Sequence, residues 1–305
     1  MPYYIREVPG DNGVTTQAWE ITETEAVRLG VTNARQGPGC YYSANPGEDI
    51  FDAVRRQTPW FAPNGENPFH RITLEPGEYY PRIARPSDNF LNESPGRNPA
   101  AQAQSEYIAI AVSQLTALTE QLRHICQTVH PVGNNLDAFG HDIRNLLILG
   151  CTEVETHWRG VLEANGVQLN RYSTNDYYKL RDAMRLNEYE VSFPHFPWLS
   201  IVSPFKNWDA AKPTESLVWY DAYNAVKHNR ENEFARATLK NLFESISACA
   251  IMLIAQFGLY VDGWRNSEPA KFFQFRAVPK WKPKDVYMSP YPETARVGKS
   301  VLFPF

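Results

Sequence analysis

Residues Leu217 to Phe257 have the sequence LVWYDAYNAVKHNRENEFARATLKNLFESISACAIMLIAQF, and this stretch decides the fold class. In its first part, successive residues turn by about 100° around a helix axis, which separates apolar and polar side chains onto opposite faces. The apolar face contains Trp219, Ala222, Tyr223 and Val226, and the polar face contains Asp221, Asn224, His228 and Glu231. Pro213, Thr214 and Ser216 precede the pattern, and hydroxyl groups there can cap the first free N–H groups. The stretch therefore predicts an amphipathic surface helix.

A second helix is predicted from about Phe234 to Phe257. After Ile246 its residues are apolar nearly all round, which is typical of a helix that is buried on every side. Gly258 is suited to end it. We expect Ile251 and Ile254 to be almost fully buried in the core.

The composition narrows the class of protein. The chain has 305 residues, of which 43% are hydrophobic and 21% charged, so it can bury a core in one large domain or two ordinary ones. The net charge of −4 argues against a globally basic protein, and any nucleic-acid surface would have to be a local patch. The cysteines are scattered without a CxxC pair, which indicates reduced thiols and a cytoplasmic protein.

Several kinds of site and segment lack a signal in the sequence. The N-terminus has no apolar signal segment, and the apolar run Ile246–Ala255 is too short to span a bilayer. HExxH, GxGxxG, GxxxxGK[ST] and GxSxG motifs do not occur. We therefore expect no membrane association, no metal and no cofactor.

Residues 1–100 are predicted to form a loop-rich, β-leaning region. Short strand-like pieces alternate with turn signals, and one short helix is expected at Phe51–Arg56. The strand-like pieces are Tyr3–Val8, Trp19–Thr22, Cys40–Ser43, His70–Leu74 and Glu78–Ala84. Pro86–Ala100 has the composition of a linker.

Residues 101–260 are predicted to form a helical bundle. Apolar stripes predict helices at Gln104–His130, Leu136–Asn165 and Asp176–Leu186, ahead of the two helices described above. Four to five helices with apolar stripes are best buried against one another, so the fold class is mostly α. Residues 261–305 are expected to be an extended tail with a short strand at Phe272–Val278.

The segment Tyr223-Asn224-Ala225-Val226-Lys227-His228, placed ahead of a long apolar helix, resembles the HEPN superfamily. The hallmark of this superfamily is an arginine followed a few residues later by a histidine, often with a polar residue directly after the arginine. Asn224 and His228 match the polar residue and the histidine. The resemblance covers about Gln104 to Gly258 and implies a HEPN-like helical bundle.

The resemblance also implies an activity. In active members, histidine and arginine cut RNA without a metal: the 2′-hydroxyl attacks the neighbouring phosphate, histidine moves protons, and arginine stabilises the charged phosphorane. Members act as homodimers and occur in prokaryotic defence and toxin–antitoxin systems. By resemblance, the expected partners are RNA, a second copy of the chain and a protein such as an antitoxin.

This sequence departs from the hallmark, because none of Asp221, Ala222 and Tyr223 is an arginine. A replacement cation would have to come from Lys227, from Arg230 or from Arg144 on the second helix. The predicted catalytic residues are therefore His228, Asn224 and Arg144, and the predicted RNA-binding residues are Lys227, Arg230, Lys280, Trp281 and Lys282. In the other interpretation, Asn224 and His228 only satisfy backbone groups at a helix junction. Arg144 and Glu153 flank an apolar run, where we expect them to be partly buried and held in an ion pair.

The segment Lys271–Lys284, KFFQFRAVPKWKPK, interleaves cations with aromatic rings and contains no acid. Bases can stack on exposed rings while cations meet phosphates. The alternative, which we favour for this segment, is an edge strand whose lysines prevent aggregation and whose rings pack inward.

The sequence thus supports two classes of function. The first is an RNA-directed protein, either a metal-independent ribonuclease-type effector or a degenerate relative that binds RNA. The second is a catalytically inert, dimeric helical interaction module. An enzyme whose chemistry the sequence does not announce is a third possibility.

Overall fold

The structure is a computed structural model that describes residues 3–10, 13–61, 65–88, 101, 104–259, 263–290 and 298–305. Contacts divide the chain into two compact units. The sheet unit comprises Met1–Tyr79, Arg85–Pro99 and Trp281–Val301, and the helical unit comprises Tyr80–Ala84, Ala100–Lys280 and Leu302–Phe305. The predicted linker lies mostly outside the described residues, as does most of the predicted turn at Pro63-Asn64-Gly65.

The sheet unit contains a five-stranded antiparallel sheet with the strand order β4-β3-β2-β1-β5. The strands are β1 (Tyr3–Gly10), β2 (Gly13–Ile21), β3 (Glu25–Arg28), β4 (Tyr41–Ser43) and β5 (Phe69–Arg71). Alternation puts Trp19, Tyr42 and Phe69 on one face, where they form a core with the helix α1 (Ile50–Gln57). Two short strands, β6 (Glu78–Tyr79) and β9 (Lys299–Ser300), pair in parallel beside the sheet.

The sequence predicted this unit in outline only. The strands β1 and β2 are longer than expected, and β3 was missed, because its four residues alternate too briefly to give a pattern. The strand predicted at Glu78–Ala84 is wrong beyond Tyr79. From Tyr80 the chain leaves the sheet unit, and Arg82 adopts a left-handed backbone conformation with φ of 56°.

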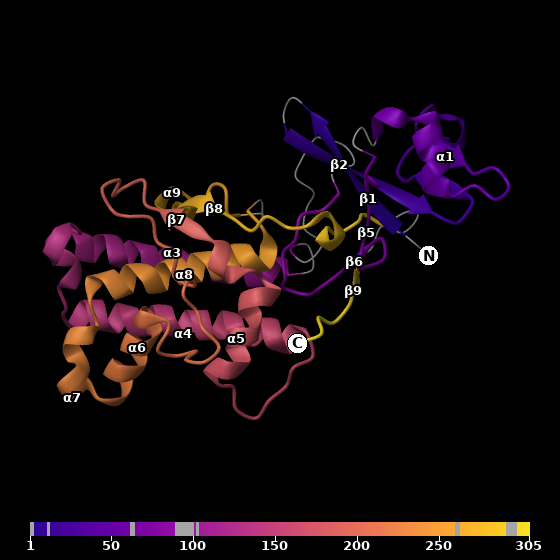
Figure 1. The fold of residues 1–305 in the computed structure, drawn as a ribbon. Helices are drawn as coiled ribbons and strands as arrows, with labels where there is room; N and C mark the ends of the chain where they lie inside the picture. Colours follow the sequence, from indigo (N-terminus) through magenta and orange to yellow (C-terminus); the bar gives the residue numbers. More distant parts are fainter. Residues whose placement is uncertain are drawn as a thin grey trace. The chain divides into compact units, whose positions relative to one another are not determined.

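The helical unit makes the chain mostly helical (Figure 1). Its principal helices are α3 (Ser105–Thr128), α4 (His141–Ala164), α5 (Thr174–Ala183), α6 (Val218–His228) and α8 (Leu239–Phe257). Shorter pieces are the 3₁₀ turns η3 (Gly133–Asp137), η4 (Leu186–Glu188) and η5 (Phe234–Arg236), the helices α7 (Arg230–Glu233) and α9 (Glu268–Phe272), and the antiparallel strands β7 (Glu190–Ser192) and β8 (Gln274–Ala277).

The helix α8 is the centre of this unit and packs between α3 and α4 (Figure 1). From Leu239 to Phe257 only Lys240 and Glu244 are not buried, and the expected burial of Ile251 and Ile254 is confirmed. The nearly continuous apolar pattern after Ile246 therefore reflects contact on all sides.

Helix boundaries differ from the prediction where a cap or a break decides them. The last bundle helix begins at Leu239 instead of Phe234, because the Thr238 side chain accepts a hydrogen bond from the Asn241 backbone and starts a new helix there. The second begins at His141 instead of Leu136, after extended backbone at Gly140. The predicted strand at Phe272–Val278 is confirmed only for Gln274–Ala277. No helix in the described ranges is long and apolar enough to cross a membrane.

Candidate functional site

The predicted junction lies in the last two turns of α6. Asn224 donates its side-chain Nδ2–H to the Tyr220 carbonyl one turn earlier, over 3.2 Å. His228 is the last residue of the helix and is exposed, and no hydrogen bond or ion pair joins its side chain to another described residue. The amide is therefore bonded to its own helix, whereas the imidazole is open to solvent.

Arg144 reaches this junction from α4. Its Nη2 donates to the Val226 carbonyl over 3.2 Å, and its Nη1 donates to the Asn145 side chain over 3.3 Å. The expected partial burial is confirmed, but no ion pair to a carboxylate forms among the described residues. The guanidinium instead binds a carbonyl near the C-terminal end of α6, where helix geometry leaves carbonyls without partners. Its position ties α4 to α6.

An arginine that the sequence did not single out contacts α6 from the turn η5. Arg236 forms a hydrogen-bonded ion pair with Asp221 and a second contact with Glu233 at 3.5 Å. Asp221, Asn224 and His228 are spaced three and four residues apart, so they share one face of α6. We call this set with Arg236 the α6 face. No spacing rule pointed to Arg236, because it comes from η5 and reaches α6 only through the fold.

The predicted RNA-binding residues come from both units. Lys227 donates to the Tyr223 hydroxyl over 2.7 Å, and Arg230 is exposed at the start of α7. Lys280 belongs to the helical unit, whereas Trp281 and Lys282 belong to the sheet unit.

The aromatic residues of the tail are largely occupied by internal contacts. The Arg85 guanidinium lies 5.0 Å from the centre of the Trp281 ring. Phe272 and Phe273 are buried. These contacts agree with the inward-packed alternative for the tail.

A second group of polar side chains, which the sequence missed, lies between α3, α4 and α8. His157 and Gln256 are buried there, and Tyr107 and Glu153 are half-buried. The Tyr107 hydroxyl and the Gln256 amide Nε2 each lie 2.9 Å from Nδ1 of His157. The other ring nitrogen, Nε2, faces the Glu153 carboxylate at 3.4 Å. We call Tyr107, Glu153, His157 and Gln256 the buried polar chain.

The hydrogen bonds determine the state of His157. Gln256 Nε2 can only donate, so Nδ1 must accept and the ring proton must sit on Nε2, toward Glu153. Burial, together with the positive charge of Arg82, lowers the pKa of His157 to about 3. Burial also raises the pKa of Glu153. The imidazole is therefore neutral at physiological pH.

Burial limits the reactions that the buried polar chain could catalyse. Hydroxyl, imidazole and carboxylate stand in the order that activates a nucleophile. However, His157 is only 2% exposed, and its lowered pKa makes it a weak base. We therefore assign the buried polar chain a structural role. Its members fall within otherwise apolar helix stripes, so sequence spacing gave no signal for their association.

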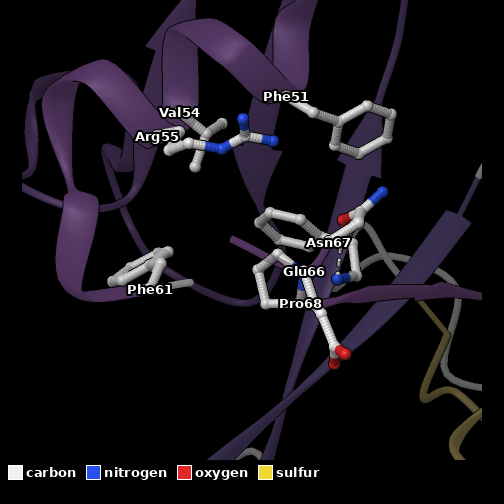
Figure 2. Close-up of a pocket in the computed structure, with 8 residues that line it drawn as sticks. Phe51, Val54, Arg55, Phe61, Glu66, Asn67 and Pro68 are labelled. Atoms are coloured by element: carbon white, nitrogen blue, oxygen red, sulfur yellow. Dashed lines mark hydrogen bonds between the residues drawn. The ribbon is translucent and has the colours of Figure 1, made fainter. Parts of the chain in front are cut away.

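The sheet unit has a small hollow beside α1 (Figure 2). It is lined by Phe51, Val54, Arg55, Phe61, Glu66, Asn67, Pro68 and Phe69. The labelled Glu66 carboxylate points away from the phenylalanine rings, so the lining favours an apolar group (Figure 2). Within the described ranges, no group of three or more His, Cys, Asp or Glu side chains is placed to hold a metal ion.

Comparison of the chain with models of protein families, with curated proteins and with solved structures finds no match.

Proposed function

We propose that the helical unit is a catalytically inert interaction module that pairs with a second copy of itself. The observation that carries this proposal is the position of Trp198. Its ring is 50% exposed and bonds to the Pro131 carbonyl, directly before Val132, which is 46% exposed. Exposed tryptophans are strongly enriched among the residues that dominate binding energy in protein interfaces.

The Trp198 ring is held in place before any partner arrives. Its Nε1–H donates to the Pro131 carbonyl over 2.8 Å, and the His130 ring packs against it at 5.0 Å between centroids. The Phe196 ring packs edge-to-face against the Trp198 ring, with 6.0 Å between the ring centroids, and also packs on Phe243 of α8. A fixed aromatic side chain loses little conformational entropy on binding.

The surroundings favour self-association. We define the Trp198 surface as His130, Val132, Pro197 and Trp198, none of which is an acid or a permanently charged base. A two-fold contact brings a surface against its own copy, so charged members would face like charges. An uncharged, largely apolar surface avoids this repulsion.

The α6 face supports the inert part of the proposal. The Asn224 amide and the Arg144 guanidinium are hydrogen-bonded to backbone carbonyls, and Arg236 is neutralised by two carboxylates. An RNA phosphate would have to displace these partners before it could pair with either guanidinium group.

Sedimentation velocity of the full chain over a micromolar concentration range tests the proposal. We expect a monomer–dimer equilibrium that Trp198→Ala weakens by about 30-fold or more in Kd. Trp60→Ala is the matched control, because Trp60 is 69% exposed but belongs to the sheet unit. A wild-type chain that stays monomeric, or equal weakening by both substitutions, would contradict the proposal.

RNA is a second candidate partner, and the arrangement of the α6 face favours it. Arg236 reaches the face where the HEPN-like hallmark lacks its arginine, and the exposed His228 lies on the same side of the helix. In this case the protein would be a degenerate HEPN-like relative that binds RNA or cleaves it without a metal.

Incubation with total RNA, with and without EDTA, separates the two candidates. If the α6 face cleaves RNA, His228→Ala should reduce the rate by roughly 10²–10⁴ while EDTA has no effect. His124→Ala provides an exposed histidine control on α3. Cleavage that survives His228→Ala rules out this residue as the catalyst, and the absence of both cleavage and salt-dependent RNA binding leaves the interaction module.

A further inference from the structure

The segment Tyr80–Ala84 is inserted into the helical unit although the residues on both sides of it belong to the sheet unit. Its backbone meets two helix ends. The Ala84 N–H donates to the Ala255 carbonyl in the last turn of α8 over 2.9 Å, and the Pro81 carbonyl accepts from Asn165, which follows α4, over 2.8 Å. We call this segment the strap.

The strap delivers a buried guanidinium. Arg82 is only 7% exposed and has a left-handed backbone, with φ of 56°. Its Nε donates to the Gln256 side-chain oxygen over 2.7 Å, and its guanidinium carbon lies 4.0 Å from the centre of the Tyr107 ring. Aromatic faces and amide oxygens are both favourable neighbours of a guanidinium.

The helix α4 leaves room for the Arg82 guanidinium at Gly160. A methyl group at Gly160 of α4 would lie 2.1 Å from Nη1 of Arg82, which is far inside van der Waals contact. Glycine is a poor residue for a helix interior, so its presence here has a packing reason. A Cβ at this position of the slot would require the Arg82 guanidinium to move.

The acceptor in the slot is oriented before the guanidinium arrives. The Gln256 amide donates to His157 Nδ1 over 2.9 Å and to the Met252 carbonyl over 2.7 Å. With its nitrogen held on that side, its oxygen must face Arg82. The slot therefore consists of groups that belong to α3, α4 and α8 and that are independent of the strap.

We infer that the space between Tyr107, Gly160 and Gln256 is a guanidinium-binding site, which the chain fills with its own Arg82. The ligand class is an alkylguanidinium, such as an arginine side chain. The positive charge is favoured by the C-terminal ends of α4 and α8, toward which helix dipoles are negative. One amine, Nη2, has no hydrogen-bond partner in the described part of the chain, so recognition depends on Nε and on the Tyr107 ring.

Chemical rescue tests this assignment on the full chain. Arg82→Ala should lower the midpoint of thermal unfolding by roughly 5 °C or more, because the Gln256 oxygen loses its donor in a buried site. Methylguanidinium at about 10 mM should recover about 2–4 °C of this loss, and methylammonium at the same ionic strength should recover none. Neither compound should raise the midpoint of the wild-type protein, whose site is full.

Two further variants decide the question even if Arg82→Ala does not fold. Arg82→Lys keeps the charge and Arg82→Met fills the space, but neither presents a guanidinium. Both should unfold at least about 4 °C below the wild type, whereas Arg159→Ala, on the exposed side of α4, should stay within about 2 °C of it. A wild-type midpoint for either Arg82 variant, or a rescue that is absent or equal for both compounds, would overturn the assignment.

Discussion

The α6 face and the buried polar chain are both built from polar side chains of the helical unit, but they are held in opposite ways. On the α6 face, Asn224 bonds to its own helix and Arg236 reaches Asp221 from fifteen residues away. In the buried chain, His157 and Gln256 are 99 residues apart, and Arg82 joins from 174 residues before Gln256. The first set is a local surface arrangement, whereas the second exists only when the bundle is assembled.

This difference has a consequence for stability. An exposed polar group regains water when its partner is lost, whereas a buried one is left without any partner. Substitutions in the bundle interior should therefore be costly, and equivalent substitutions on the α6 face should be nearly neutral. The contrast should be greatest for the apolar core that encloses the buried polar chain.

The largest effect is expected for a charge in that core. Ile251 is fully buried in α8, and Ile251→Asp places an unpaired carboxylate there, which should lower the free energy of unfolding by about 4 kcal/mol or more. Ile110→Asp on α3 is the matched control, because Ile110 is 68% exposed, and it should cost less than about 1 kcal/mol. Chemical denaturation of both variants measures the difference. Similar losses in the two variants would show that burial is not what separates the interior from the surface.

The sequence predicted local features of the helical unit well and its tertiary contacts poorly. The helices α3, α4, α5, α6 and α8 were predicted because apolar stripes recur with the helical period. Their starts at Leu239 and His141 were missed, since a threonine cap and an extended glycine decide them locally. In the candidate site, Asn224 and His228 lie on one face of one helix, so spacing alone was enough to group them.

The rest of the site could not be predicted, because it depends on tertiary contacts. Arg236 is brought to Asp221 by the turn η5, and Arg144 to Val226 by the packing of α4 on α6. Arg82 lies in a segment that the sequence placed in a strand. A strand pattern of a few residues cannot reveal that the chain enters a different unit at that point.

A smaller but still large effect is expected when a histidine is removed from each region. His157→Ala removes the acceptor of the Tyr107 hydroxyl and one of the two acceptors of the Gln256 amide, and it opens a cavity, so it should cost about 3 kcal/mol. His228→Ala removes an exposed side chain and should change stability by less than about 0.5 kcal/mol. Equilibrium unfolding in urea compares the two. Equal effects would break the contrast between the regions.

Acid should weaken the protein through His157. Its pKa is lowered from 6.5 to about 3 in the folded chain, so the unfolded chain binds the proton first as the pH falls. The stability contributed by the neutral imidazole is therefore complete above about pH 6.5 and is lost progressively between pH 6.5 and about 3. At pH 5 the loss should be about 2 kcal/mol.

The variant His157→Gln isolates this effect. Glu153 acts in the opposite direction, because its raised pKa makes the folded chain the better proton acceptor on acidification. Since Glu153 is present in both proteins, the stability advantage of the wild type over His157→Gln should shrink by about 2 kcal/mol between pH 7 and pH 5. An advantage that is constant over this range would mean that His157 does not stay neutral in the folded chain.

The smallest effect is expected on the α6 face, where Asp221→Asn removes one carboxylate from Arg236. The side chains of this pair are 40% and 29% exposed, so water and salt screen their attraction, and the loss should be under about 1 kcal/mol. About 1 M NaCl should abolish it. Glu163→Gln, which breaks the exposed pair with Arg159 on α4, is the matched control and should behave in the same way.

Because Asp221→Asn also leaves Arg236 with fewer competing carboxylates, it should strengthen salt-dependent RNA binding if RNA meets this face. A loss above about 2 kcal/mol that resists salt would instead make the pair a structural contact and remove the main support for RNA at α6.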